Sequence, residues 1–325
     1  MRDPIACLGA GRMGRGIAVV FAYAGHQVSL VDFKPRDDAA FAKLSDEALA
    51  EVRNVLRLLA QFGLFDEAAV DSIAARVSVV PECGAQAALS SAGIIFEGVP
   101  EMLDLKRAAL ERASQLAGPN PIIASTTSTI LVDDLSSAVD QPERFLNAHW
   151  LNPAFLVPLV EVSPGAQTDP AITARVKALL EGVGKVPVVC AARPGYIVPR
   201  IQALAMNEAA RMVEEGVASA EDIDKAIRYG FGFRFAILGL LEFIDWGGGD
   251  ILYYASRYLE GALASDRYRA PDVIADNMRD GRIGMRTGAG FLDYSGLDVD
   301  AYREQRLAAM VELLRHFKLA RPPVL

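Results

Sequence analysis

A glycine-rich turn near the N-terminus restricts the possible folds more than any other feature of this sequence. In the stretch IACLGAGRMGRGIAVVFAYAGHQVSLVDF, an apolar strand leads through the turn into a helix predicted at residues 12–24, and then into a second strand that ends at Asp32. In such a βαβ unit, Gly9 permits the tight turn, Gly11 lets the backbone approach a pyrophosphate, and Gly14 lets the helix pack closely on the strand. The spacing therefore predicts a dinucleotide-binding fold.

The same segment indicates which dinucleotide is bound. The free N–H groups at the start of the helix, at Arg12 and Met13, and the partial positive charge there suit a pyrophosphate. Asp32 can accept both ribose hydroxyls of NAD, whereas its charge would repel the 2′-phosphate of NADP. Lys34 and Arg36 follow closely, either as solvated loop charges or as cations that soften this preference. We expect NAD, with NADP as the alternative.

The remaining sequence divides into a strand-rich first part and a helical second part. Further apolar strands are predicted at 77–80, 94–99, 121–126, 145–150 and 186–190, with helical patterns between several of them and a long amphipathic helix at 38–62. Such strands predict a mostly parallel sheet covered on both faces. After Cys190 only helices are predicted. The expected fold is α/β, with a Rossmann-type NAD-binding domain at 1–192 and an all-α domain for substrate binding and dimerisation at 193–325.

Charge and cysteine content exclude several classes of function. The net charge of -8 leaves no general basic field for a nucleic acid or an anionic membrane. No apolar run approaches the roughly 18 residues of a membrane span, and the first strand follows the N-terminus without an apolar signal segment. Cys7, Cys83 and Cys190 have neither disulfide nor metal-ligand spacing. We expect a cytoplasmic protein with a small-molecule substrate and no metal.

A histidine and a glutamate stand alone in the nearly uncharged run FLNAHWLNPAFLVPLVEV. His149 and Glu161 are either satisfied polar groups in a core or a catalytic pair. Histidine suits proton transfer near neutral pH because its ordinary pKa is about 6.5. A fixed carboxylate selects the useful tautomer and raises that pKa. We expect two consecutive strands, joined by LNPAFLVP, to bring both side chains to one end of the sheet.

Taken in order, these motifs resemble the 3-hydroxyacyl-CoA dehydrogenase family over essentially the whole chain. The ordered set is LGAGRMG, Asp32, EGVPE with Lys106 behind it, STTSTI, AHWLNP with PLVEV, RPGYIVPR and GRIGMRTGAGFLDY. The resemblance implies that His149 removes the proton from a substrate hydroxyl while hydride passes to the nicotinamide. It also implies that Glu161 accepts a hydrogen bond from the other imidazole nitrogen, and that the protein is a homodimer.

The resemblance implies roles for four further polar residues. Ser128 in STTSTI would hydrogen-bond the reacting oxygen and the catalytic histidine, or else cap the short helix that follows. Asn152 would hold the catalytic loop or the nicotinamide amide, with a plain turn before a proline as the alternative. Glu97 and Lys106 match family positions near the nicotinamide end of the cofactor, although a surface ion pair would explain them equally well.

Two departures from the family pattern concern the substrate. The family usually has an asparagine in FxxNR, whereas YIVPR here places Pro199 at that position, with neither an amide side chain nor a backbone N–H. Fatty-acid enzymes of the family carry a lysine-rich patch for the CoA phosphates in the region 38–62. Here that region offers only Lys43, Arg53 and Arg57 against several acids. The loss of these cations argues against CoA.

Aromatic residues favour a compact, planar, anionic substrate. They flank the catalytic strand and the domain junction, although core packing is the alternative for each of them: Trp150, Phe155, Tyr196, Phe231 and Phe233. We expect Trp150, Pro199 and Arg234 to contact the substrate, with Arg234 pairing a carboxylate.

The resemblance then implies a step of vitamin B6 degradation. In it, the hydrated aldehyde of 5-formyl-3-hydroxy-2-methylpyridine-4-carboxylate is oxidised to the dicarboxylic acid. Three alternatives stay open: a 3-hydroxybutyryl-CoA dehydrogenase, a dehydrogenase of a small hydroxy acid such as L-gulonate or carnitine, and a non-catalytic NAD-binding structural protein.

Overall fold

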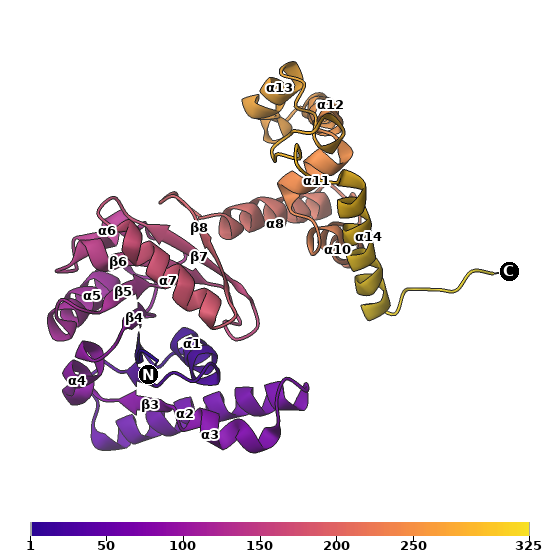
Figure 1. Cartoon of the computed structure of the whole chain (residues 1–325). Helices are drawn as coiled ribbons and strands as arrows, with labels where there is room; N and C mark the ends of the chain where they lie inside the picture. The colour runs from indigo at the N-terminus through magenta and orange to yellow at the C-terminus, as the bar shows by residue number, and fades with distance from the viewer. Residues whose placement is uncertain (1, 325) are drawn as a thin grey trace. The chain divides into compact units, whose positions relative to one another are not determined.

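The computed structural model describes residues 2–324, which form two compact units that divide between Ala205 and Met206 (Figure 1). The sequence places the boundary at 192/193, where the strand signals stop. By contacts, the two units divide within helix α8 (Val198–Glu214), which begins in the first unit and continues into the second.

The first unit is built on an eight-stranded sheet in the order β3-β2-β1-β4-β5-β6-β7-β8. The strands are β1 (Ile5–Leu8), β2 (Val28–Val31), β3 (Val77–Val80), β4 (Ile94–Glu97), β5 (Ile122–Ser125), β6 (Phe145–Trp150), β7 (Leu159–Pro164) and β8 (Val186–Val189). Neighbouring strands pair in parallel, except that β6 and β7 are antiparallel. The predicted Rossmann-type, mostly parallel sheet is confirmed.

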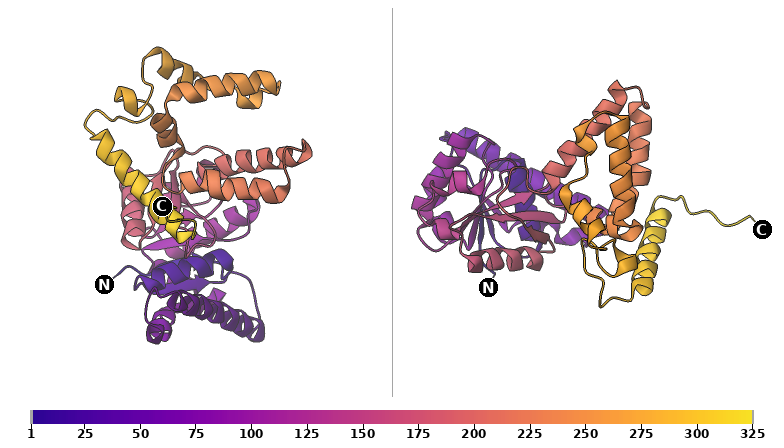
Figure 2. Two further views of the ribbon diagram at one scale, coloured as in Figure 1. Left: turned by 90° about the vertical axis from the view of Figure 1, so that its right-hand side faces the viewer. Right: turned by 90° about the horizontal axis from the view of Figure 1, so that it is seen from above.

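Helices cover both faces of this sheet (Figure 2). One face packs against α1 (Arg12–Tyr23), α2 (Asp38–Gln61), α3 (Val70–Ala74) and α7 (Pro170–Gly182). The other face packs against α4 (Ala85–Ser90), α5 (Leu103–Ala117) and α6 (Val132–Ser136). Successive side chains of a strand point to opposite faces, so Ile5 and Cys7 join the first layer while Ala6 and Leu8 join the second.

The predicted amphipathic helix at 38–62 is confirmed as α2, Asp38–Gln61. Asp37 caps its N-terminus, because the side chain accepts a hydrogen bond from the Ala40 N–H at 2.7 Å. Only one stripe of the helix is buried, formed by Ala48, Val52, Leu56 and Leu59. The polar remainder of α2 faces away from the core, which is why the helix keeps its charged residues.

The second unit is helical, as predicted. It contains the rest of α8, α9 (Ala220–Ala226), a π-helical turn (Ile227–Phe231), α10 (Gly232–Phe235), α11 (Leu240–Gly247), α12 (Gly249–Ala262), α13 (Asp272–Arg279) and α14 (Val299–His316). The segment GRIGMRTGAGFLDY packs onto α11 around the buried Asp245. Its carboxylate accepts the N–H groups of Phe291 and Leu292 and the hydroxyl of Tyr294.

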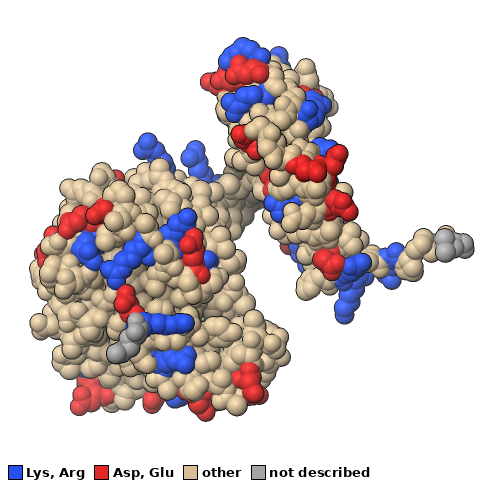
Figure 3. All heavy atoms as spheres, viewed as in Figure 1, with Lys and Arg blue, Asp and Glu red and all other residues tan. Residues whose placement is uncertain are grey.

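The surface carries charges of both signs. On the face seen in Figure 3, acidic and basic side chains are interspersed on each unit among neutral ones. Within residues 2–324, no helix has both the length and the apolar character that crossing a membrane requires.

Candidate active site

The glycine-rich turn between β1 and α1 forms an open cradle at the end of the first strand. Gly9 has φ +95°, which favours glycine, and a Cβ on Gly14 would lie 2.2 Å from the Gly9 carbonyl oxygen. Both glycines are therefore required by the protein itself. A Cβ on Gly11 would meet no described atom within 4 Å. Neither the backbone conformation nor the packing explains the glycine at this position. The open space beside it fits a pyrophosphate that approaches the backbone closely.

Helix α1 presents its N-terminus to this space. Gly11 is its N-cap residue, and among the described residues no side chain caps the helix and no acid lies in its first turn. The first N–H groups, at the exposed Arg12 and the half-buried Met13, are left for an anionic ligand. The predicted phosphate-binding turn thus has the geometry that a dinucleotide requires.

Asp32 follows β2 at the same edge of the sheet, and Arg36 binds it. The Arg36 Nε lies 2.5 Å from Asp32 Oδ2, and the Lys34 backbone N–H donates to Oδ1 at 3.4 Å. Arg36 is therefore not the solvated loop charge that was one of the alternatives. A carboxylate has about four acceptor sites, so Asp32 keeps capacity for ribose hydroxyls. A cavity of about 620 Å³ opens beside Lys34 and Arg36.

His149 and Glu161 face each other across two strands. Residue 149 of β6 and residue 161 of β7 are direct partners in the antiparallel pair, and His149 Nδ1 lies 2.7 Å from Glu161 Oε2. Glu161 is fully buried, and His149 is 6% exposed. The predicted contact is confirmed. A carboxylate only accepts, so Nδ1 carries the shared proton and Nε2 is left to take a proton from a ligand.

The second oxygen of Glu161 caps α8. Oε1 accepts the backbone N–H groups of Ile197 at 2.9 Å and Val198 at 2.8 Å, at the start of this helix. A negative charge is favoured at a helix N-terminus. Glu161 is therefore held from both sides, and it fixes the orientation of the histidine ring.

Tyr196 covers one face of the His149 ring. The two rings are stacked, with centroids 5.1 Å apart and planes 8° from parallel. The Tyr196 hydroxyl donates to the Thr127 carbonyl oxygen and accepts from Asn147 Nδ2, both at 3.0 Å. The sequence suggests Tyr196 only as one of several aromatic residues near the site, since no local pattern tells which ring meets the histidine.

Ser128 lies in the loop after β5 and is bound to Glu101. Its backbone N–H donates to Glu101 Oε1 at 2.9 Å, and its hydroxyl donates there at 3.4 Å. The alternative that Ser128 caps the following helix is wrong, because α6 begins at Val132, four residues further on, and Leu131 is its N-cap residue. Its contact with a reacting oxygen stays a prediction.

Glu101 holds the loop formed by Thr127, Ser128 and Thr129, here called the serine loop. The sequence analysis did not identify this role. Besides Ser128, its Oε1 accepts the Thr127 hydroxyl at 2.5 Å and both the N–H and the hydroxyl of Thr129 at 2.9 Å. Burial acts to raise its pKa, but these hydrogen bonds and the charge of Lys106 outweigh burial and lower the pKa of Glu101 to about 2. The signal in the sequence is the second glutamate of EGVPE.

Glu97 and Lys106 form a buried ion pair, so the alternative of a surface pair is wrong. Lys106 Nζ lies 3.0 Å from Glu97 Oε1 and 3.4 Å from Glu101 Oε2, and it donates to the Val99 carbonyl at 3.1 Å. Glu97 is 0% and Lys106 1% exposed. These side chains hold the loop after β4, since Glu97 also accepts the Val99 N–H. Their place near the nicotinamide end of the cofactor stays a prediction.

Asn152 is exposed in the loop after β6 and lines a cavity of about 430 Å³ with Arg12, Arg15 and Phe155. The first turn of α1 and the loop that follows His149 therefore lie on one cavity. The glycine turn, the serine loop and His149 each follow or end a strand at the carboxyl edge of the parallel sheet, where ligands of such sheets bind.

Comparison with known proteins agrees with this geometry. The sequence profile for the NAD binding domain of 3-hydroxyacyl-CoA dehydrogenase matches residues 4–193, and the profile for its C-terminal domain matches residues 195–294. The chain belongs to the 3-hydroxyacyl-CoA dehydrogenase family. It is an NAD-dependent dehydrogenase.

Relatives within the family act on different substrates. The chain is 29% identical over 315 residues to 5-formyl-3-hydroxy-2-methylpyridine 4-carboxylate 5-dehydrogenase of Mesorhizobium japonicum, covering 96% of this chain and 97% of the relative. It is also 29% identical to a probable 3-hydroxybutyryl-CoA dehydrogenase of Bacillus subtilis, covering 89% and 96%. The solved 3-hydroxyacyl-CoA dehydrogenase of Archaeoglobus fulgidus superposes with a TM-score of 0.77, at 30% identity, covering 98% of this chain and 100% of that one.

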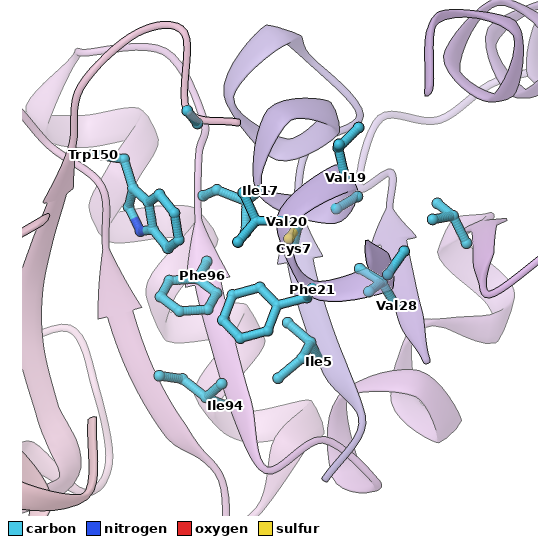
Figure 4. Packing of buried hydrophobic residues seen from close by; sticks show 14 of the residues in the cluster. Ile5, Cys7, Ile17, Val19, Val20, Phe21, Val28, Ile94, Phe96 and Trp150 are labelled. Atoms are coloured by element: carbon cyan, nitrogen blue, oxygen red, sulfur yellow. The ribbon is translucent and has the colours of Figure 1, made fainter. Parts of the chain in front are cut away.

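Trp150 is buried in the core of this dehydrogenase, so the prediction that it contacts the substrate is wrong. The side chain is 1% exposed and packs in the core against Phe21 and Phe96, with ring centroids 6.2 and 5.6 Å away (Figure 4). Neighbouring residues of a strand point to opposite faces. Because His149 points toward Glu161 and Tyr196, Trp150 must point into the core layer beneath α1.

Pro199 and Arg234 lie in different parts of the dehydrogenase. Pro199 is the second residue of α8 and half-buried, in the first turn, where its missing N–H removes no helical hydrogen bond. Arg234 lies in α10 of the second unit, exposed, with its guanidinium 5.3 Å from the centre of the Phe243 ring. Contact of either residue with substrate stays a prediction.

Proposed function

We propose that this dehydrogenase oxidises the hydrate of 5-formyl-3-hydroxy-2-methylpyridine-4-carboxylate to the dicarboxylic acid, with NAD as the acceptor. The observation that carries the choice of a small anion is the charge pattern of α2. This helix carries three cations and four acids. Each cation already lies beside a polar partner: Lys43 is 4.0 Å from Glu47, Arg53 is 3.8 Å from Asp71, and Arg57 donates to Asn54. The acids repel the phosphates of CoA, and cations that already have polar partners are less available to bind them.

The dyad supplies the proton chemistry of this oxidation. His149 Nε2 would take one hydroxyl proton of the gem-diol while the same carbon gives up its C–H hydrogen as hydride, and the product would be the carboxylic acid. NAD, when bound along Gly9, Gly11 and the first turn of α1 with its ribose at Asp32, supplies the hydride acceptor. Glu161 stabilises the imidazolium that forms, through the Nδ1 hydrogen bond. A general base of this kind contributes about 100-fold to 10000-fold to the rate.

Oxidation of a hydrated aldehyde and of a secondary alcohol requires the same catalytic groups. Each carries a hydroxyl on a carbon that also bears the departing hydride, so one base and one acceptor serve both. The family fold needs no new catalytic group for the aldehyde. We attribute the difference to the residues that bind the substrate: Pro199 supplies no side-chain amide, and an arginine, for which we propose Arg234, can pair the ring carboxylate.

A 3-hydroxyacyl thioester is the second candidate. The cavity beside Asn152 supports it, because much of its lining is apolar, including Val19, Val52, Val55 and Phe155, and suits a flexible chain. The equal identity to the Bacillus subtilis relative supports it as well.

We also propose a homodimer formed through the second unit and a reducing, cytoplasmic setting. Large apolar side chains of the second unit are exposed on α8 and α12: Met206, Val213, Ile251, Tyr254 and Tyr258. Such a set of exposed apolar residues is typical of a subunit interface. All three cysteines are unpaired in the structure.

An NADH absorbance assay tests the substrate directly. We expect the pyridine aldehyde to give the highest kcat/KM in a panel with 3-hydroxybutyryl-CoA, L-gulonate and carnitine. A higher kcat/KM for 3-hydroxybutyryl-CoA would replace the small-aldehyde assignment with the thioester one.

A further inference from the structure

The short segment between β8 and α8 folds back against the dyad in an unusual backbone conformation. Gly195 has φ 78° and Tyr196 has φ 43°. The left-handed region is unfavourable for a residue with a bulky side chain. Such a conformation persists only when surrounding contacts hold it, and here those contacts are the catalytic pair and its neighbours.

Tyr196 is held in two places, through the backbone that follows it and through its hydroxyl. The backbone that follows it donates to Glu161 from Ile197 and Val198. At the other end, the hydroxyl lies between the Thr127 carbonyl and Asn147, whose amide also donates to the Ile130 carbonyl at 3.0 Å. Burial raises the pKa of the Tyr196 hydroxyl above its usual range, so it stays protonated and can donate. The ring therefore cannot turn freely.

The partners of this ring connect it directly to His149. Asn147 is fully buried and lies two residues before His149 on β6, so both side chains point to the same face. On that face the tyrosine ring lies almost parallel to the imidazole. A phenylalanine would fill the same stack, but it would leave the Thr127 carbonyl and one Asn147 N–H without this partner. The hydroxyl sets the angle of the ring that lies against the base.

We infer that Tyr196 is a positioning residue of the catalytic centre, whose anchored ring holds the His149 imidazole against Glu161 and presents an aromatic face to its cationic form. Tyr196 can have this role only if His149 is the base, as proposed above. The face of an aromatic ring attracts a cation, so the stack favours the imidazolium that forms as the substrate hydroxyl loses its proton.

Two substitutions separate the contribution of the ring from that of its hydroxyl. Tyr196→Leu removes the stack, and we expect kcat to fall about 10-fold to 100-fold with little change in the KM for NAD. Tyr196→Phe keeps the stack and loses two hydrogen bonds, and we expect kcat to fall about fivefold. Tyr294→Phe is the matched control, because it removes another buried hydroxyl, the one bound to Asp245 in the second unit. It should leave kcat unchanged.

The pH profile gives a readout that a purely structural role would not move. Without the aromatic face the imidazolium is less favoured, so the basic form of His149 persists to lower pH. We expect the acid limb of kcat/KM to move down by about 0.5 pH unit in Tyr196→Leu and to stay in place in Tyr196→Phe. The other titratable groups that act on this stack, Glu161, Cys190 and Glu101, are unchanged in both variants.

NMR tests the same inference without turnover. The chain has three histidines, so the His149 ring signals can be assigned by comparison with His149→Asn. We expect the Nδ1 proton shared with Glu161 to exchange faster in Tyr196→Leu than in the wild type. A folded Leu variant with unchanged kcat, acid limb and Nδ1 exchange would overturn the role of Tyr196. If that variant does not fold, an unchanged kcat in Tyr196→Phe would overturn it. An active His149→Asn would instead refute the base assignment.

Discussion

His149 on β6 and Glu161 on β7 lie directly opposite each other, with Nδ1 and Oε2 2.7 Å apart. The antiparallel pairing of these two strands makes this possible, because a short connection can return residue 161 to the position facing residue 149. A parallel connection would need a crossover of a dozen or more residues. The change of strand direction therefore places a base and its carboxylate at the edge where the cofactor turn lies.

His149→Asn should remove most turnover and leave NADH binding near that of the wild type. The substitution deletes the base, whereas the glycine turn and Asp32 are untouched, so we expect kcat to fall about 100-fold to 10000-fold. Steady-state rates and NADH fluorescence titration measure the two effects. His26→Asn is the matched control, because this buried histidine bonds the Asp3 carbonyl instead. Retention of more than about a third of wild-type turnover would remove His149 from the mechanism.

Glu161→Gln should impair turnover, and its effect should not multiply with that of His149→Asn. The two side chains act as one unit, so once the base is lost the carboxylate has little left to contribute. Rates of both single variants and the double variant measure this coupling. We also expect a lower Tm for Glu161→Gln, because the helix α8 loses a charged cap. Fully multiplicative losses in kcat would contradict a working pair.

Alanine at Gly11 and at Gly14 should give opposite results. At Gly14 a Cβ would lie 2.2 Å from the Gly9 carbonyl oxygen, so we expect a loss of about 1–3 kcal/mol in the free energy of unfolding. At Gly11 the Cβ meets no described atom within 4 Å, so stability should hold while the KM for NAD rises about tenfold. Denaturant unfolding and NAD titration of both variants test this. An unchanged KM in Gly11→Ala would argue against pyrophosphate at this turn.

The Asp32–Arg36 pair should set the preference between NAD and NADP. We expect Asp32→Ala to narrow the difference in kcat/KM between the cofactors, because the repelling charge is gone. Arg36→Ala should widen it, because the Asp32 carboxylate then has no ion-pair partner at 2.5 Å to offset its charge. Both ratios come from initial rates at matched salt. Equal use of the two cofactors by the wild type would mean that Lys34 or Arg36 has taken over recognition.

The contribution of Glu101 to stability should depend on pH. Burial acts to raise the pKa of Glu101, but hydrogen bonds from Thr127 and Thr129 and the charge of Lys106 outweigh burial and lower the pKa from 4.5 to about 2. A lowered carboxyl pKa stabilises the folded state above the unfolded value, and the contribution is lost as pH falls through the folded value. The difference in unfolding free energy between wild type and Glu101→Gln should therefore be constant above about pH 4.5 and shrink toward pH 2. A difference that grows on acidification would contradict this.

Local patterns in the sequence were sufficient for the fold and for part of the site. The βαβ unit, the amphipathic α2 and the cofactor turn depend on residues close in the chain, whose spacing encodes period, turn and backbone approach. The pairing of His149 with Glu161 was also predictable, because two adjacent strands with a short connection have few ways to meet.

Only the tertiary structure decided which neighbours complete the site. Strand alternation shows that His149 and Trp150 point to opposite faces, but not that Trp150 belongs to the core. The burial of Glu97 with Lys106 and the stacking of Tyr196 on His149 depend on contacts between residues far apart in the chain. The physical reason is that burial and ring contacts depend on how layers pack, whereas sequence spacing reports only local geometry.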